Sequence, residues 1–169
     1  IEFFSLKMLG IKSKKGPNPK WDPLPDWVPP KVFEQKVSGN VFYLTYGRSP
    51  ITSHTHSADN ELLAAIGRPE HFRVWINAKA ARALGISDGD LVKVTSLATN
   101  GSATARAFVT EGIRPDTVFL VSAWGHESSK LTVASKIAGI SMNRLWPLHC
   151  DDMLPNAMTQ EVLVRVEKA

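Results

Sequence analysis

The sequence contains little cysteine and no long apolar run, and both absences exclude whole classes of protein. Cys150 is the only cysteine among 169 residues. The chain therefore cannot form an internal disulfide framework, a thiolate-based cluster or a zinc finger of its own. No segment approaches the roughly 20 consecutive apolar residues that a membrane span needs. The compartment stays open, because a single cysteine does not decide it.

Common nucleotide-binding motifs and targeting signals are also absent. The sequence has no Gly-x-x-x-x-Gly-Lys phosphate loop, no Gly-x-Gly-x-x-Gly after a predicted strand and no internal repeat. The chain starts at Ile1, without an initiator methionine or a charged-then-apolar signal pattern. We therefore expect the chain to come from a longer or processed protein, in which targeting information lies elsewhere.

The composition is that of one folded domain with an appendage. Hydrophobic residues make up 43% and charged residues 21% of the chain, which suits one core and excludes a disordered polyelectrolyte. The net charge of +4 mildly favours anionic partners. A nucleic-acid module would need a basic stripe with interleaved aromatic residues, and none continues beyond the lysines of the first twenty residues. We predict no nucleic-acid partner and no direct membrane span.

Residues 1–34 are predicted to form a proline-rich N-terminal arm or linker. Six of the eleven prolines fall in this segment, and proline favours extended backbone in itself and in the residue before it. Trp21 and Trp27 indicate that the arm docks, because free linkers rarely carry two tryptophans. Residues 35–169 are then expected to form the folded domain.

The rest of the chain alternates short strands with short helices. Asn77 and Gly85 are suited to begin and end one helix, and Asn100-Gly101 predicts a hairpin turn. Strands are expected at 41–44, 72–76, 91–96, 103–110, 117–121 and 161–166, and helices at 61–66 and 78–84. Many short strands with few helices favour a barrel over a doubly wound sheet. The predicted fold is mostly β with short helices, of the α+β class.

One helix-turn-strand unit, residues 76–92, resembles the signature of double-psi β-barrels. Further motifs follow in a fixed order around it: Tyr46-Gly47-Arg48, His54-Thr55-His56, Asn60, the segment 110–115, Trp124-Gly125-His126 and Asn143. The whole set resembles the C-terminal cofactor-binding domain of the dimethyl sulfoxide reductase family of molybdenum and tungsten enzymes. Within that family it is most similar to catalytic subunits of the polysulfide or thiosulfate reductase type.

This resemblance implies a six-stranded double-psi β-barrel that binds molybdopterin guanine dinucleotide. In the family two such dinucleotides (bis-MGD) hold molybdenum or tungsten, and the metal ligand and any iron–sulfur cluster lie in other domains. The implied partners are those remaining domains of the catalytic subunit and an iron–sulfur electron-transfer subunit. The implied activity is an oxidoreductase of anaerobic respiration that reduces a sulfur compound or a similar oxyanion. Cys150 does not match the metal-ligand position, so the fragment alone is expected to be inactive.

A dense polar run, residues 45–60, lies between a predicted strand and a predicted helix and indicates a ligand cradle. Buried polar side chains need hydrogen-bonding partners. A pterin dinucleotide would engage hydroxyls, amides and an occasional guanidinium or imidazole. No residue is predicted to be catalytic or to bind a metal. The predicted cofactor-binding residues are Tyr46, Gly47, Arg48, Ser49, Ser53, His54, Thr55, His56, Asn60, Trp124, Gly125, His126, Glu127 and Asn143.

Four of these residues have a second interpretation. Arg48 would donate hydrogen bonds to a phosphate or a pterin carbonyl, or form a surface salt bridge. Asn60 would form hydrogen bonds with the edge of a heterocycle, or cap a helix that begins near Ser57. Trp124 could be a core residue, and Asn143 a turn residue.

The two histidines of the polar run have three interpretations. On an extended chain, residues two apart point the same way, so His54 and His56 could form a two-imidazole metal site. They could also make structural hydrogen bonds, or contact the cofactor and influence its electronics.

An alternative function is a freestanding double-psi barrel that binds proteins or peptides, as in the N-terminal domains of some ATPases. Such a module would not need the polar run.

Overall fold

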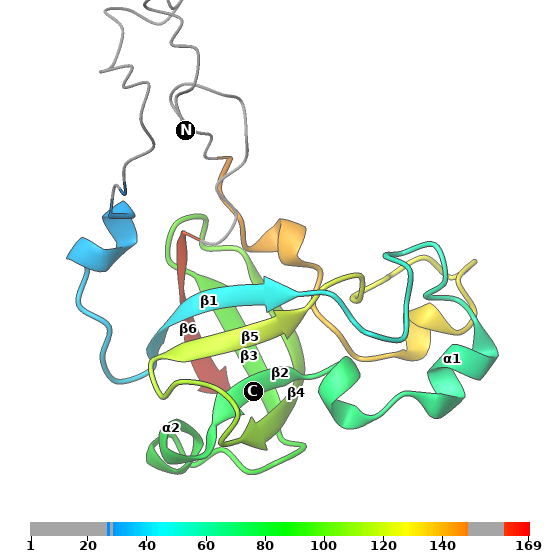
Figure 1. The fold of residues 1–169 in the computed structure, drawn as a ribbon, viewed down its shortest axis with the longest axis horizontal. Coiled ribbons are helices and arrows are strands. Elements are labelled where there is room, and N and C mark those ends of the chain that lie inside the picture. The colour runs from blue at the N-terminus through cyan, green and yellow to red at the C-terminus, as the bar shows by residue number, and fades with distance from the viewer. Residues whose placement is uncertain (1–26, 28, 149–160) are drawn as a thin grey trace, which may run out of the picture.

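The computed structural model describes residues 27, 29–148 and 161–169 (Figure 1). Most of the predicted arm, with Trp21 and the lysines of the first twenty residues, lies outside the described residues, and so does Cys150. The described part of the arm includes a short 3-10 helix, η1 (Lys31–Glu34). The division of the chain after residue 34 therefore stays a prediction.

Six strands form one closed barrel. Their order around the barrel is β1-β5-β2-β4-β3-β6. Two neighbouring pairs, β1–β5 and β2–β4, are parallel, and the remaining pairs are antiparallel. This arrangement confirms the predicted six-stranded double-psi β-barrel. The strands are β1 (Val41–Gly47), β2 (Val74–Asn77), β3 (Leu91–Ser96), β4 (Ser102–Thr110), β5 (Thr117–Val121) and β6 (Val162–Lys168).

Alternating side chains of the strands fill the barrel. In β3, Val92 and Val94 are buried, whereas Lys93 between them is exposed. The neighbouring strand β6 contributes Val164 and Val166 to the same core. This is the period of two that places successive strand residues on opposite faces. Burying a valine of this kind stabilises the fold by about 1.5–3 kcal/mol.

Local sequence signals fix the helices α1 (Glu61–Ile66) and α2 (Ala78–Ala83). The Asn77 side chain accepts a hydrogen bond from the Lys79 main-chain N at 2.9 Å and caps α2. Gly85 follows the helix in the left-handed region, with φ of +66°. Asn100 in the β3–β4 turn has φ of +60°, as a tight hairpin requires. Of the helices in the described ranges, none has the length and apolar character needed to cross a membrane.

The element boundaries differ from the predicted ones where main-chain pairing sets them. β1 continues to Gly47 because its last residues pair with β5. β2 begins at Val74, because Phe72 ends a 3-10 helix, η2 (Pro69–His71). Two further 3-10 helices were not predicted, η3 (Ala134–Lys136) and η4 (Met142–Arg144). Pairing with a distant strand is not encoded in a local pattern, so element ends are the weakest part of such a prediction.

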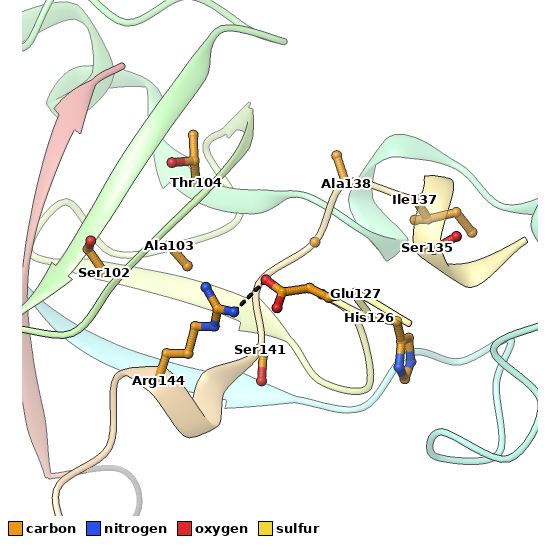
Figure 2. Close-up of a pocket in the computed structure, with 12 residues that line it drawn as sticks. Ser102, Ala103, Thr104, His126, Glu127, Ser135, Ile137, Ala138, Ser141 and Arg144 are labelled. Atoms are coloured by element: carbon orange, nitrogen blue, oxygen red, sulfur yellow. Dashed lines mark hydrogen bonds and ion pairs between the residues drawn. The ribbon is translucent and has the colours of Figure 1, made fainter. Parts of the chain in front are cut away.

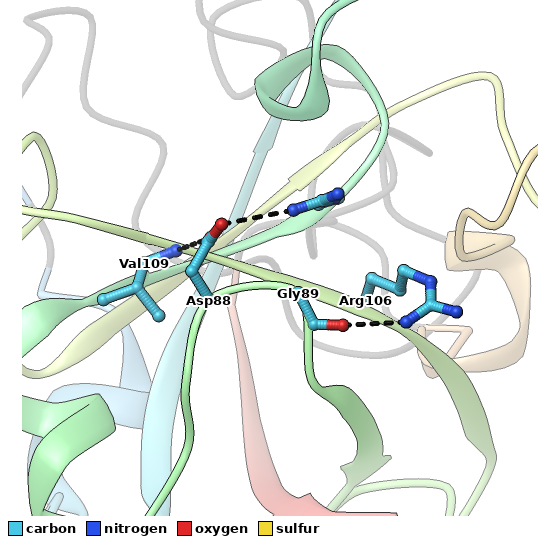
Figure 3. A network of polar contacts seen from close by, with 5 residues as sticks. Asp88, Gly89, Arg106 and Val109 are labelled. Carbon is cyan, nitrogen blue, oxygen red and sulfur yellow. Dashed lines mark hydrogen bonds and ion pairs between the residues drawn. The ribbon is translucent and has the colours of Figure 1, made fainter.

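The turn before β3 is held by an acidic side chain (Figure 3). Asp88 accepts a hydrogen bond from the Val109 main-chain N at 2.9 Å and forms an ion pair with Arg73 at 3.4 Å. The Gly89 carbonyl accepts a hydrogen bond from Arg106 Nη1 at 2.9 Å. These contacts anchor the turn to the ends of β2 and β4, so its polar groups serve the fold.

The loops that follow β1 and β5 lie together at one end of the barrel, on the right of Figure 1. Because the two strands are parallel and adjacent, Gly47 and Val121 end them at the same edge. A second, smaller core packs the loops against each other there and contains Ala58, Trp124 and Ala134 together with Val121. The fold therefore brings the two segments with most predicted site residues to one rim.

Candidate functional site

Hydrogen bonds join the loops of this rim into one unit. The Ser122 main-chain N donates to the Gly47 carbonyl at 2.8 Å, at the point where both strands end. Farther along, the Asp59 carboxylate accepts hydrogen bonds from the main-chain N of Val133 at 2.8 Å and of Ala134 at 2.9 Å. The polar run of residues 45–60 is therefore fixed to the long loop of residues 122–141. Sequence reasoning did not select Asp59, because its partners are main-chain groups far along the chain.

The Asp59 contact is expected to depend on pH. Hydrogen bonds from Ala134 and then Val133 favour the ionised carboxylate and lower the pKa of Asp59 below its usual 3.8. A carboxyl with a lowered folded-state pKa stabilises the fold above its unfolded pKa, and this contribution is lost as the pH falls through the folded pKa. We expect the main-chain amides of Val133 and Ala134 to lose hydrogen-exchange protection as the pH falls below 3.8.

The matched variant for this measurement is Asp59→Asn, which keeps an acceptor oxygen but cannot ionise. After correction for intrinsic exchange, protection of these amides in the variant should not change between about pH 5 and pH 2. An equally flat profile in the wild-type chain would show that the carboxylate does not control the contact.

A polar pocket of about 330 Å³ opens beside these loops (Figure 2). Its walls come from the start of β4, the loop after β5 and the segment around η4. Three predicted residues, Gly125, His126 and Glu127, lie together in it. The other polar groups are supplied by Ser102, Thr104, Ser135, Ser141 and Arg144. Asn143 does not line the pocket and is exposed in η4, between the lining residues Ser141 and Arg144.

Close backbone crossings form the wall of this pocket. A Cβ atom on Gly125 would lie 2.2 Å from the Ser141 main-chain N, and one on Gly139 would lie 2.3 Å from the Trp124 Cβ. A Cβ atom on Gly101 would lie 1.9 Å from the Arg144 carbonyl oxygen. Real Cβ atoms do not approach so closely, so these positions require glycine. The three crossings bring the hairpin, the loop after β5 and η4 into contact.

One cation and one anion dominate the electrostatics of the pocket. The Arg144 guanidinium donates a hydrogen bond to the Glu127 carboxylate and forms an ion pair with it (Figure 2). His126 lies on the side of Glu127 that faces away from Arg144 (Figure 2). Its Nε2 is 2.9 Å from the Ala123 carbonyl oxygen. Ala123 itself has φ of +75°, which an alanine adopts only when its surroundings impose it. The loop after β5 is therefore held in a defined, strained conformation.

Arg48 lies at a different pocket. This second pocket measures about 210 Å³ and is also lined by His71, Trp75 and Phe119. The two pockets share no lining residue. Among the described residues, no ion pair involves Arg48, which is exposed. The structure thus divides the predicted site between two pockets.

Tyr46 and Gly47 lie just before Arg48, at the end of β1. The Tyr46 ring packs against Trp146, with ring centroids 5.0 Å apart. A Cβ atom on Gly47 would lie 2.9 Å from the Phe119 ring, so glycine permits close approach here. The approach that the structure shows is to an aromatic side chain.

The polar run folds into consecutive turns. His54 has φ of +50°, and the Ser53 main-chain N donates to the Ser57 hydroxyl at 2.8 Å. The assumption of an extended chain was therefore wrong, and with it the argument that His54 and His56 face the same way. Ser53, His54, Thr55 and His56 are all exposed. The described ranges contain no group of three or more His, Cys, Asp or Glu side chains placed to hold a metal ion.

The remaining predicted residues have structural roles in addition to any ligand contact. Ser49 is buried, and its hydroxyl accepts a hydrogen bond from the Ile51 main-chain N at 3.4 Å. Asn60 caps α1, which begins at Glu61 rather than near Ser57, by accepting from the Leu63 main-chain N at 3.0 Å. Trp124 is 4% exposed and belongs to the second core. The capping and core interpretations are thus correct, and ligand contact by these residues stays a prediction.

Buried donors without partners indicate that this end of the barrel fits a polar ligand. In the part of the chain that the structure describes, the indole Nε1 atoms of Trp124 and Trp146 and the Thr52 hydroxyl are buried without a hydrogen-bond partner. Unpaired buried polar groups are costly and therefore point to an absent water or ligand. With the pocket's hydroxyls, imidazole and guanidinium, these groups suit a phosphorylated heterocycle.

Sequence reasoning missed several residues that line the pocket. Arg144 is adjacent to the predicted Asn143, and Ser102 is adjacent to the predicted turn at Gly101, so both lay beside recognised signals. Only the folded barrel reveals that the β3–β4 hairpin closes one side of the pocket, since the hairpin and η4 are distant in sequence.

Comparisons with known proteins give a consistent result. A family model described as "Molydopterin dinucleotide binding domain" matches residues 42–162. The formate dehydrogenase-O major subunit of Escherichia coli (strain K12) is 37% identical over 127 residues, which are 70% of this chain and 12% of that protein. The thiosulfate reductase molybdopterin-containing subunit PhsA of Salmonella typhimurium is 25% identical over 135 residues, which are 79% of this chain and 16% of that protein.

A solved structure supports the fold. Acetylene hydratase from Pelobacter acetylenicus aligns with a TM-score of 0.65 and 13% identity, over 89% of this chain and 22% of that chain. The chain therefore spans only a small part of the proteins that it resembles.

Proposed function

The chain belongs to the family of molydopterin dinucleotide binding domains, and from this premise we propose that it binds a molybdopterin guanine dinucleotide. The match confirms the resemblance to the cofactor-binding domain of molybdopterin oxidoreductases. The observation that carries the proposal is the polar pocket at the rim. Its lining combines hydroxyls, an imidazole and a guanidinium, which are the groups that a dinucleotide diphosphate and its heterocycles require.

The residues proposed to contact the cofactor are divided among the two pockets, the second core and the rest of the rim. Gly125, His126 and Glu127 belong to the polar pocket, and Asn143 lies beside it. Trp124 packs in the second core beside these residues, and its indole N–H has no hydrogen-bond partner among the described residues. Arg48 presents its guanidinium at the second pocket. The remaining proposed contacts lie on the same rim: Tyr46, Gly47, Ser49, Ser53, His54, Thr55, His56 and Asn60.

The parent protein is proposed to be an oxidoreductase in which this chain is the C-terminal domain or a separate cofactor-binding part. The relatives are the major subunit of a formate dehydrogenase and the molybdopterin-containing subunit of a thiosulfate reductase. We propose a sulfur compound or a similar oxyanion as substrate. The bound molybdenum or tungsten would supply the redox chemistry, while this chain binds and orients the dinucleotide. The proposed partners are the other domains of the catalytic subunit and an iron–sulfur electron-transfer subunit, and the isolated chain is proposed to be inactive.

Cofactor retention in the full-length parent tests the proposal. We expect Arg48→Ala to reduce the retained pterin at least about tenfold, because a hydrogen bond to a charged group contributes about 1.5–3 kcal/mol. Asn143→Ala should reduce it about two- to tenfold, as expected for a neutral hydrogen bond. Both side chains are exposed, so the barrel should remain folded. Pterin is measured by fluorescence after oxidation, and molybdenum and tungsten by elemental analysis.

The control is Lys79→Ala, which changes an exposed residue of α2 outside both pockets. It should leave cofactor content unchanged. Wild-type occupancy in both test variants would contradict the site assignment, and a wild-type parent without pterin or metal would overturn the proposed function.

A further inference from the structure

The polar pocket is lined by one guanidinium, that of Arg144, and a carboxylate of the same pocket neutralises its charge. Arg144 and Glu127 form an ion pair across the pocket (Figure 2). The other lining residues that bear polar side chains are serines, a threonine and His126. An anionic ligand can therefore gain the strongest donor in the pocket only by replacing the Glu127 carboxylate.

The backbone of Arg144 is fixed, whereas its side chain can change partner. The Arg144 main-chain N donates to the Ser141 carbonyl at 3.2 Å, and the Arg144 carbonyl oxygen accepts from the Thr99 hydroxyl at 3.4 Å. Gly101 packs directly against the same carbonyl. The side chains of Arg144 and Glu127 are 48% and 70% exposed. An ion pair with this exposure contributes little to stability, so a better anion can replace the carboxylate at small cost.

We propose that Arg144 is the phosphate-binding residue of the pocket, and that Glu127 holds its guanidinium until the diphosphate of the dinucleotide arrives. This inference rests on the proposed function and assigns the diphosphate to one guanidinium. A planar guanidinium forms two parallel hydrogen bonds with a phosphate as readily as with a carboxylate. The hydroxyls of Ser102 and Ser141 line the same pocket and can donate to the remaining phosphate oxygens.

Glu127 then acts by competition with the ligand. Its carboxylate keeps the guanidinium oriented across the pocket and opposes anion entry through like charge. Removing the carboxylate should therefore strengthen diphosphate binding, whereas removing the guanidinium should weaken it. A residue pair that served only the fold would not give opposite effects, since breaking the pair from either side would have the same consequence.

Titration of the 169-residue chain with inorganic pyrophosphate, followed by calorimetry, separates these cases. We expect Glu127→Gln to tighten pyrophosphate binding roughly two- to fivefold, which corresponds to the strength of an exposed ion pair. Arg144→Gln should weaken binding at least about tenfold, because a charge-assisted hydrogen bond is lost. The Arg144→Lys variant keeps the charge but cannot form two parallel hydrogen bonds. Its pyrophosphate affinity should lie between those of Arg144→Gln and the wild-type chain.

Matched controls remove the same charges elsewhere. Glu34→Gln in η1 and Arg82→Gln in α2 change exposed residues outside the pocket and should leave pyrophosphate affinity unchanged. Weaker binding in both Glu127→Gln and Arg144→Gln would overturn the inference, because the intact pair would then be needed. Wild-type affinity in both variants, or no pyrophosphate binding by the folded wild-type chain, would also overturn it.

A second arm keeps this inference separate from the proposed function. In the full-length parent, Arg144→Gln should lower the retained pterin at least about tenfold, and Glu127→Gln should retain more pterin than Arg144→Gln. Equal retention in wild-type and Arg144→Gln parents would overturn the phosphate assignment while leaving the dinucleotide site in place. A wild-type parent that lacks pterin would instead overturn the proposed function, and the pyrophosphate titration would still decide the role of Arg144.

Discussion

Replacing Gly125 with alanine is expected to destabilise the chain by about 2–5 kcal/mol and to distort the polar pocket. Two separate costs add up at this position. Gly125 has φ of +82°, and a Cβ atom there would lie 2.2 Å from the Ser141 main-chain N and 2.7 Å from the Ile140 carbonyl carbon. The backbone of the loop after β5 would have to move away from residues 139–141. Because both segments line the pocket, the parent should also lose cofactor.

The matched control for this variant is Gly85→Ala. Gly85 has a similar φ of +66°, but no atom lies within 4 Å of its Cβ position. The control should therefore show only the left-handed backbone cost of about 1–2 kcal/mol. Thermal and urea unfolding of the two variants isolate the cost of the backbone crossing. Equal destabilisation by both substitutions would contradict the close contact, and undiminished pterin in the Gly125→Ala parent would separate the crossing from cofactor binding.

The barrel could be predicted from the sequence because its signals are local. Val92 and Val94 alternate with polar residues, Asn77 is a good helix cap, and Gly85 suits the left-handed position after that helix. Each signal acts within a few residues and survives in the folded chain. The order of the strands around the barrel does not arise in this way, since it depends on contacts between distant segments. It was available only through the resemblance.

The candidate site could be predicted only in part. The sequence motifs identified the loop that contains Gly125, His126 and Glu127, but not its partner Arg144, which is 17 residues away from Glu127 along the chain. The predicted cofactor-binding residues were expected to gather around one ligand, yet Arg48 and Glu127 line different pockets. Residue type predicts the chemistry that a side chain can perform. The fold decides which side chains meet.

The second large effect is expected at Trp124, whose removal should collapse the second core. The side chain is 4% exposed and packs edge to face against Phe72, with ring centroids 4.8 Å apart. Trp124→Ala is therefore expected to cost about 3–5 kcal/mol, the usual range for a buried aromatic residue. The barrel core is a separate cluster, so the loops should open first. Hydrogen exchange should show lost protection at Ala134 before it changes at Val164.

Trp124→Phe separates the packing role of this residue from ligand contact. Phenylalanine keeps an aromatic ring but removes the indole N–H, which is buried without a partner among the described residues. If the cofactor accepts a hydrogen bond from that N–H, the variant should lose less stability than Trp124→Ala but retain several-fold less pterin in the parent. We expect the loss of pterin, because a buried donor without an acceptor would otherwise destabilise the fold. Undiminished pterin in Trp124→Phe, together with a large loss in Trp124→Ala, would make Trp124 a packing residue alone. The unpaired indole would then need a water molecule as its acceptor.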